Sequence, residues 1–135
     1  MTFYLCARYA RRDELRAYAA ALTAAGHVVR ARWLDEQHAL DYQPSAAESV
    51  AMARTSRADI MNCDVVIAFT EDPSAVIPGA SRGGRHHEFG FADAAGKRLV
   101  VIGPRENIFH HGERVEDQFN NWKACLAAIK RGEIA

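Results

Sequence analysis

Short apolar runs alternate with longer helix-like segments along the whole chain, and this alternation restricts the fold more than any other feature. The apolar runs predict strands at residues 3–7, 27–33, 65–69, 99–102 and 115–119. The segments that follow predict helices, most clearly the first, where apolar residues recur at helical spacing. These helices are expected at residues 11–25, 45–63, 86–95 and 122–131. The order predicts an α/β fold of three layers, a parallel sheet of four or five strands with helices on both faces.

Local start and stop signals support these boundaries. Ser45 and Glu48 form the S-x-x-E pattern of a capping box, and Asn121 can cap the last helix. Gly26 and Gly96 stand where glycine commonly ends a helix. The chain has 135 residues, which is the size of one domain, so residues 1–135 are expected to fold as a single unit.

Charge and composition argue against several classes of partner. Lys and Arg number 17, as do Asp and Glu, so no overall basic field indicates a nucleic acid polymer. No apolar stretch reaches the roughly 18–20 residues of a membrane span, and the N-terminus lacks the pattern of a signal peptide. The three cysteines have no metal or redox spacing, which predicts free buried thiols. We therefore expect a cytoplasmic protein that does not bind membranes.

Polar residues, glycines and arginines gather in the loops that follow three of the predicted strands. These loops cover residues 7–11, 70–85 and 103–111. In open parallel sheets, ligands bind outside the carboxyl ends of the strands. The coincidence predicts a small-molecule site at this edge.

The segment from residue 81 to residue 90, SRGGRHHEFG, is the densest of these features. Two glycines before a helix expose backbone N–H groups, and two arginines flank them, which favours a phosphate or another anion. The residues expected to bind substrate here are Ser81, Arg82, Gly83, Gly84, Arg85 and His86. A Gly-rich surface turn with solvated arginines is the alternative. The segment contains neither G-x-G-x-x-G nor G-x-x-x-x-G-K-[ST].

Glu88 lies near the start of an otherwise apolar helix, at the predicted mouth of the sheet. A partly desolvated carboxylate in this position can act as a nucleophile or as a general acid or base. The alternative is a simple favourable interaction with the helix dipole.

Two pairs of adjacent histidines, at residues 86–87 and 110–111, raise the question of a metal site. Adjacent helical residues point about 100° apart, so such a pair rarely binds one ion, and H-E-x-x-H is absent. We expect no metal, and a hydrogen-bonding role near the ligand for one histidine of each pair.

Taken together, several segments resemble the nucleoside 2-deoxyribosyltransferase superfamily, which also contains 2′-deoxynucleoside 5′-phosphate N-hydrolases. They are Tyr4-Leu5-Cys6, residues 58–68 (ADIMNCDVVIA), residues 83–92 (GGRHHEFGFA) and residues 96–103 (GKRLVVIG). The resemblance covers residues 2 to about 130. It implies a flavodoxin-like or Rossmann-like sandwich, a homodimer or larger homo-oligomer, and cleavage of an N-glycosidic bond without a cofactor.

The resemblance also implies roles for particular residues. Glu88 matches the family's nucleophile, and Tyr4 matches the tyrosine that orients it. Arg8 falls in a loop that contacts sugar or phosphate. Residues Asn107, His110 and His111 fall in the loop that approaches a neighbouring subunit's site.

The chain departs from the family pattern at two positions. Ser56 stands close to where the family has an aspartate in the helix before the third strand. Asp59 lies one turn further on, so the acid role is assigned to Asp59 as a hypothesis. Arg82 stands six residues before Glu88, where the relatives have Asp or Ser, and the loop before Glu88 is longer.

These features predict an enzyme that cleaves the N-glycosidic bond of a (2′-deoxy)nucleoside 5′-monophosphate or nucleoside, through a glycosyl ester of Glu88. The arginines Arg8, Arg82 and Arg85 favour a 5′-phosphate and hence a nucleotide hydrolase. A transferase acting on unphosphorylated nucleosides is the first alternative. A non-catalytic nucleotide-sensing module is a second, and a flavin protein is a weaker third.

Overall fold

The computed structural model describes residues 1–75 and 83–134. It contains one parallel sheet with the strand order β2-β1-β3-β4-β5. The strands are β1 (Thr2–Cys6), β2 (Val28–Val29), β3 (Val65–Phe69), β4 (Arg98–Ile102) and β5 (Val115–Phe119). The helices are α1 (Arg12–Ala24), α2 (Ala46–Met61), α3 (Gly84–Ala94) and α4 (Trp122–Lys130), with 3₁₀ helices η1 (Tyr9–Arg11), η2 (Arg32–Asp35) and η3 (Ile108–His111).

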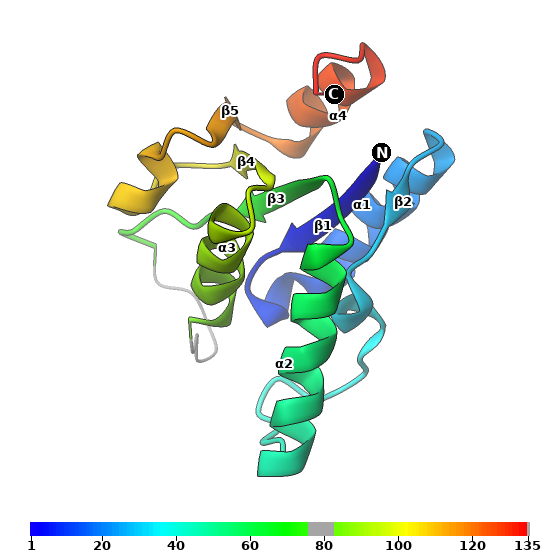
Figure 1. Ribbon diagram of the computed structural model, residues 1–135, viewed down its shortest axis with the longest axis vertical. Coiled ribbons are helices and arrows are strands. Elements are labelled where there is room, and N and C mark those ends of the chain that lie inside the picture. Colours follow the sequence, from blue (N-terminus) through cyan, green and yellow to red (C-terminus); the bar gives the residue numbers. More distant parts are fainter. Residues whose placement is uncertain (76–82, 135) are drawn as a thin grey trace.

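Helices cover both faces of the sheet, as the sequence predicts. Helices α2 and α3 lie side by side on one face, and α1 lies behind the sheet (Figure 1). Helix α4 joins α1, since the rings of Tyr18 and Trp122 stack with centroids 4.5 Å apart. The three-layer α/β prediction is confirmed.

The predicted caps position the helices. Ser45 Oγ accepts a hydrogen bond from the Glu48 backbone N–H at 3.1 Å, and Glu48 Oε1 accepts one from the Ser45 N–H at 3.2 Å. This capping box begins α2 at the predicted place. Asn121 Oδ1 accepts from the Ala124 N–H at 2.9 Å and begins α4. Gly26 adopts φ 87° after α1, a left-handed conformation that glycine adopts without strain.

The second strand is much shorter than predicted. A strand over residues 27–33 is wrong, because β2 ends after two residues. The Asp59 carboxylate accepts a hydrogen bond from the Arg32 backbone N–H at 2.9 Å, and the Trp33 indole N–H donates to the Leu5 carbonyl at 2.9 Å. These side-chain bonds replace the strand ladder, so the chain turns out of the sheet into η2.

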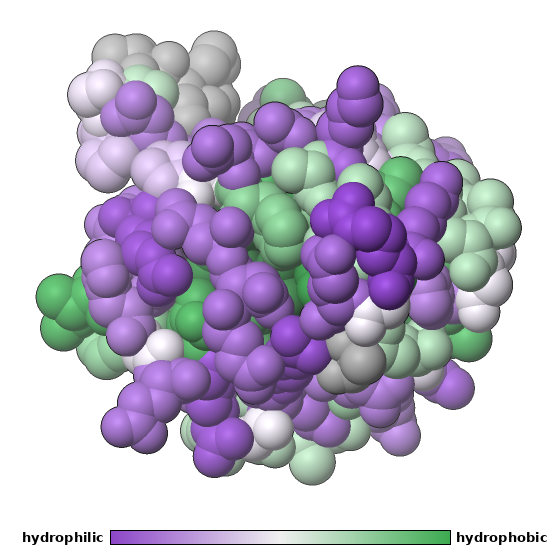
Figure 2. Space-filling view, turned by 90° about the horizontal axis from the view of Figure 1, so that it is seen from above, coloured by the Kyte–Doolittle hydropathy of each residue, from purple (hydrophilic) through white to green (hydrophobic). Residues whose placement is uncertain are grey.

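The core is apolar and contains the central strands. Every residue of β3 is buried, which agrees with a strand covered on both faces. The three cysteines are buried and free, as predicted. The surface seen from above is mostly hydrophilic, with separate hydrophobic areas (Figure 2). Among the described residues, no helix has both the length and the apolar character needed to cross a bilayer.

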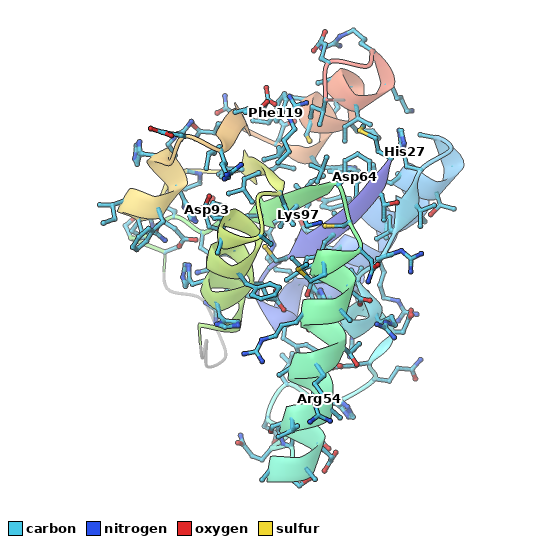
Figure 3. The ribbon with its side chains drawn as sticks, viewed as in Figure 1. His27, Arg54, Asp64, Asp93, Lys97 and Phe119 are labelled. Atoms are coloured by element: carbon cyan, nitrogen blue, oxygen red, sulfur yellow. The ribbon has the colours of Figure 1, made fainter. Side chains whose placement is uncertain are left out.

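Hydrogen bonds stabilise the end of the sheet at which the strands begin. Lys97 Nζ donates to the carbonyl oxygens of Met61 and Cys63 at 2.8 and 2.9 Å, and so fixes the end of α2. Asp64 Oδ2 accepts from the Thr2 backbone N–H at 2.7 Å. Lys97 and Asp64 lie together at this edge, away from the part of α2 that carries Arg54 (Figure 3). The polar residues at this end thus have structural partners within the chain. The carboxyl ends of the strands, on the opposite side, remain as the place for a ligand site.

Candidate active site

A cavity of about 780 Å³ lies beyond the carboxyl end of β1, between α2, the start of α3 and the segment that leads into α2. Two of the three predicted loops line it, through residues 7–10 and 83–85. The third predicted loop, residues 103–111, contributes no lining residue among those described. Residues 38–44 take its place; this segment runs beside the part of α2 that extends past the sheet (Figure 1).

Glu88, a partly buried residue of the cavity lining, pairs with a tyrosine beneath it. The Tyr4 hydroxyl donates a hydrogen bond to Glu88 Oε1 at 2.8 Å, and Tyr4 is fully buried within β1. Ser56, from α2, also lines the cavity, and hydrogen bonding from its side chain lowers the pKa of both groups. Glu88 lines the cavity from the second turn of α3. Residues of β1 and α2 thus lie beside one carboxylate of α3, and the contact between Tyr4 and Glu88 that the resemblance implies is present.

The environment of Glu88 changes its protonation. Burial raises the pKa of Glu88 from 4.5 to about 7, against the hydrogen bonds from Tyr4 and Ser56, which lower it. The negative charge of Glu36 raises it further. Burial and the charge of Glu88 raise the pKa of Tyr4 well above its usual value. Tyr4 is therefore a hydrogen-bond donor rather than a base, and Glu88 titrates close to neutral pH.

Sequence reasoning missed the cavity roles of Ser56 and Glu36. Ser56 stands one helical turn before Ile60, which also lines the cavity, so the periodicity of α2 could have placed it there. Glu36 follows η2, in a polar stretch that gives no periodic signal. Only the packing of that stretch over α2 brings it to the cavity.

Asp59, the predicted acid, lies elsewhere. Its carboxylate is buried and accepts hydrogen bonds from the Arg32 backbone N–H at 2.9 Å and from Arg32 Nε at 2.8 Å. It is not among the residues that line the cavity. Ser56 and Asp59 are three residues apart on α2, so their side chains leave the helix axis in different directions. Ser56 lies beside Glu88, and Asp59 lies beside η2. The position of Asp59 supports a structural role in place of the acid role.

Two groups in the cavity suit an anion. Arg8 lines it at the end of β1, and Gly83 and Gly84 line it at the start of α3. The N-cap residue of α3 is Gly83, at φ 79°, which has no side chain to cap the first-turn N–H groups. Among the described residues no side chain caps this helix, and such an N-terminus beside an arginine favours a negatively charged ligand. Two further predicted residues, Ser81 and Arg82, lie outside the described residues.

Arg85 lines the cavity but is already paired. Both of its terminal nitrogens contact the Glu106 carboxylate, with Nη2 3.2 Å from Oε2. The Arg85 guanidinium is therefore already engaged by Glu106.

The remaining predicted residues form a cluster outside the cavity lining. Asn107 Nδ2 lies 3.5 Å from His86 Nδ1. His110 is buried, its Nδ1 accepts from the Glu106 N–H at 3.1 Å, and its ring packs edge-on against Phe89 at 4.8 Å. Within this chain, His86, Asn107 and His110 therefore do not contact the space that Glu88 faces.

This cluster has a geometry that a metal could use. One ligand atom from each of His86, Glu106 and His110 lies within 4.8 Å of the others. The Arg85 guanidinium contacts both oxygens of Glu106, so a cation would have to displace a positive charge that is already in place. Glu106, the acidic member of this cluster, is thus already paired with Arg85.

Comparisons with solved structures identify the fold. A CMP N-glycosidase from Clostridium botulinum matches 96% of this chain and 98% of its own, with 20% identity and a TM-score of 0.62. A 2-deoxyribosyltransferase from Bacillus psychrosaccharolyticus matches 93% of this chain and 90% of its own, with 14% identity and a TM-score of 0.70. A conserved protein from Enterococcus faecalis V583 matches 98% of both chains, with 13% identity and a TM-score of 0.59.

The chain therefore has the fold of these proteins, and the resemblance to the nucleoside 2-deoxyribosyltransferase superfamily is confirmed at the level of the fold. Neither a protein-family model nor a curated protein matches the sequence. A shared fold does not by itself establish chemistry, which depends on the side chains of the site.

Proposed function

We propose that this protein is an N-glycosidase or deoxyribosyltransferase of the nucleoside 2-deoxyribosyltransferase superfamily, with Glu88 as its nucleophile. The observation that carries the proposal is the hydrogen bond from buried Tyr4 to Glu88, a carboxylate that lines a large cavity. Two proteins of the same fold are named for cleaving or transferring at an N-glycosidic bond, which supports the reaction class.

In the proposed reaction, a Glu88 carboxylate oxygen attacks C1′ of a nucleoside or nucleotide while the bond from C1′ to the base breaks. The Tyr4 hydroxyl holds the attacking carboxylate in one orientation. Water or a second base then displaces Glu88 from C1′. Two displacements retain the configuration at C1′. Access of water to the ester decides between hydrolysis and transfer.

The cavity favours a phosphorylated substrate. Arg8 and the uncapped start of α3 at Gly83 and Gly84 form a region that suits an anion, whereas a neutral nucleoside needs no such region. We therefore place a (2′-deoxy)nucleoside 5′-monophosphate ahead of an unphosphorylated nucleoside, and a hydrolase ahead of a transferase.

Self-association belongs to the same proposal. Ile108 and Phe109 on η3 are 78% and 67% exposed, beside Asn107. Large apolar side chains exposed together favour contact with another protein surface. A second copy of the chain would cover them, and would bring Asn107 and His110 to the boundary between subunits. Sedimentation of the protein with and without Phe109→Asp tests this.

The function is tested by incubating the protein with deoxynucleoside monophosphates, with nucleosides, and with a nucleoside plus a second free base. We expect release of free base from at least one monophosphate, measured by chromatography. The Asp93→Asn variant, changed at a carboxylate on the same helix as Glu88 but outside the cavity lining, should match the wild type, and Glu88→Gln should lose the activity. If wild-type protein leaves every substrate intact, the proposal fails.

A non-catalytic nucleotide-binding module remains the second candidate, because Ser56 places a hydroxyl rather than a carboxyl beside Glu88. Calorimetry distinguishes the two. Tight binding of a nucleotide that stays intact for the length of the experiment favours the binding module.

A further inference from the structure

We infer that Glu36 is the second catalytic carboxyl of this cavity, the group that gives a proton to the departing base and later takes one from water. The inference rests on the proposed function, since a base departs only if Glu88 cleaves a glycosidic bond. Glu36 follows η2 and lines the same cavity as Glu88.

The chemistry requires such a group. A base that leaves C1′ carries the electron pair of the broken bond on its nitrogen, and reactions with retention commonly use one carboxyl to attack and another to protonate the leaving group. Tyr4 has a raised pKa and already donates its proton toward Glu88. Asp59 is bonded to Arg32, away from the cavity. A serine hydroxyl such as that of Ser56 is too weak an acid.

The position of Glu36 is fixed by its own backbone. Its carbonyl oxygen accepts hydrogen bonds from the Arg12 guanidinium and from the Tyr9 hydroxyl, at 3.5 Å for the latter. Both donors belong to the turn and helix that follow β1, so Glu36 is anchored to the same edge of the sheet as the cavity. These hydrogen bonds fix the backbone from which the Glu36 side chain extends.

Glu36 and Glu88 are electrostatically coupled. Of the carboxylates in the described lining, Glu36 is the one whose charge raises the pKa of Glu88; Asp41 also lines the cavity without this effect. Two carboxylates that repel each other hold one proton between them over a range of pH. In the free protein the charge of Glu36 raises the pKa of Glu88, so the shared proton lies first on Glu88. The reaction uses the alternative arrangement of the same proton, with Glu88 ionised to attack C1′ and Glu36 protonated to donate to the base.

The charges around Glu36 allow it to hold a proton. Burial raises its pKa, while the positive charges of His38 and Arg12 lower it, and the net direction is upward. Tyr42, which senses the charge of Glu36, and Glu88 are the other titratable groups that face it. A raised pKa keeps the proton on Glu36 to a higher pH than on an ordinary glutamate, which suits a general acid.

Over the two steps, every proton and electron pair is accounted for. Glu88 forms a bond to C1′, the bond from C1′ to the base breaks with its electron pair on the base nitrogen, and the Glu36 proton neutralises that nitrogen. In the second step the Glu36 carboxylate takes a proton from the attacking water. The ester bond breaks with its electrons on Glu88, and both carboxyls return to their starting states.

The test compares two leaving groups in one variant. Glu36→Gln is assayed with an accepted nucleotide or nucleoside, and with the 4-nitrophenyl glycoside of the same sugar, whose leaving group departs as a stable anion. We expect kcat/KM for the natural substrate to fall about 10²–10⁴-fold, and that for the nitrophenyl glycoside to change much less. Because the result is a ratio within one sample, it does not depend on the folded fraction.

Asp41→Asn is the matched control, a carboxyl in the same lining, and it should keep the wild-type ratio of the two substrates. Glu36→Gln should also lose the basic limb of the pH profile, because the proton donor is gone. Equal losses on both substrates, or full activity on the natural one with an unchanged basic limb, overturn the role of Glu36. If wild-type protein releases no base at all, the proposed function has failed and Glu36 has no leaving group to protonate.

Discussion

The Tyr4 hydroxyl lies 2.8 Å from Glu88 Oε1, which joins two residues 84 positions apart in the sequence. Tyr4 occupies a central strand of the sheet, paired with β2 on one side and β3 on the other. It therefore cannot shift without disturbing the sheet. This contact places the proposed nucleophile on a rigid support.

Removal of the Tyr4 hydroxyl should make Glu88 harder to ionise. The hydrogen bond lowers the pKa of Glu88 from the value that burial alone would give, so Tyr4→Phe should raise it. The acidic limb of kcat/KM should move to higher pH by about one to two units, since a bond to a charged group contributes about 1.5–3 kcal/mol.

Tyr18→Phe is the matched control, because the Tyr18 hydroxyl donates to Glu14 at 2.7 Å outside the cavity. It should leave the profile in place. An acidic limb that stays at its wild-type pH in Tyr4→Phe contradicts the role of the hydrogen bond.

The protonation of Glu88 should also affect stability. Its folded pKa of about 7 is above the usual 4.5, so the folded state binds the proton more tightly than the unfolded chain. The associated stability is present in full below pH 4.5 and is lost as the pH rises toward 7. Relative to Glu88→Gln, wild-type protein should lose about 3 kcal/mol over this range.

Urea unfolding of both proteins at a series of pH values measures this difference. Glu14→Gln is a control of opposite sign, because its hydrogen bond with Arg11 lowers the pKa of Glu14. Its effect should be smaller, since Glu14 lies at the surface. A constant difference between wild type and Glu88→Gln from pH 4.5 to pH 8 is incompatible with a raised pKa at Glu88.

Asp59→Asn should destabilise the fold without removing the chemistry. Asp59 is 3% exposed and accepts two hydrogen bonds from Arg32, one of them from its backbone. An amide cannot accept both as a carboxylate does, and we expect a loss of about 2–3 kcal/mol in the free energy of unfolding. Turnover per folded molecule should stay within a few-fold of wild type. A collapse of kcat with an unchanged melting temperature would instead return the acid role to Asp59.

Arg8→Ala should separate phosphorylated from unphosphorylated substrates. Loss of a charge-assisted contact to a phosphate should raise KM for a monophosphate about 10–100-fold and leave KM for the matching nucleoside unchanged. Arg54→Ala, at an exposed arginine on α2 outside the cavity lining, should change neither constant. An equal rise in KM for both substrates would show that Arg8 does not bind the phosphate.

Local sequence patterns predicted most of the fold because its signals are local. The capping box at Ser45 and the glycine after α1 place helix ends through contacts within a few residues. The second strand could not be placed in this way. Trp33 and Asp59 bond to the backbone across the fold and end β2 early, and no pattern within residues 27–33 records those partners.

The sequence predicted only those parts of the site that short motifs carry, and it missed the parts that depend on contacts across the fold. Tyr4 and Glu88 are carried by sequence motifs and meet as expected. Asp59 and Ser56 share a helix, and the spacing from Ser56 to Ile60 selects Ser56 only once Ile60 is known to line the cavity. Glu36 lies in a segment whose path is set by the carbonyl contacts with Arg12 and Tyr9, and these are visible only once the chain is folded.

The central claim is a covalent bond between Glu88 and the sugar. Wild-type protein is mixed with an accepted substrate, quenched in acid within a single turnover, and examined by intact mass and peptide mapping. The proposed mechanism predicts one added glycosyl group on the peptide that contains Glu88, and none in Glu88→Gln. Base release by Glu88→Gln at the wild-type rate, or an adduct on another residue, would contradict it.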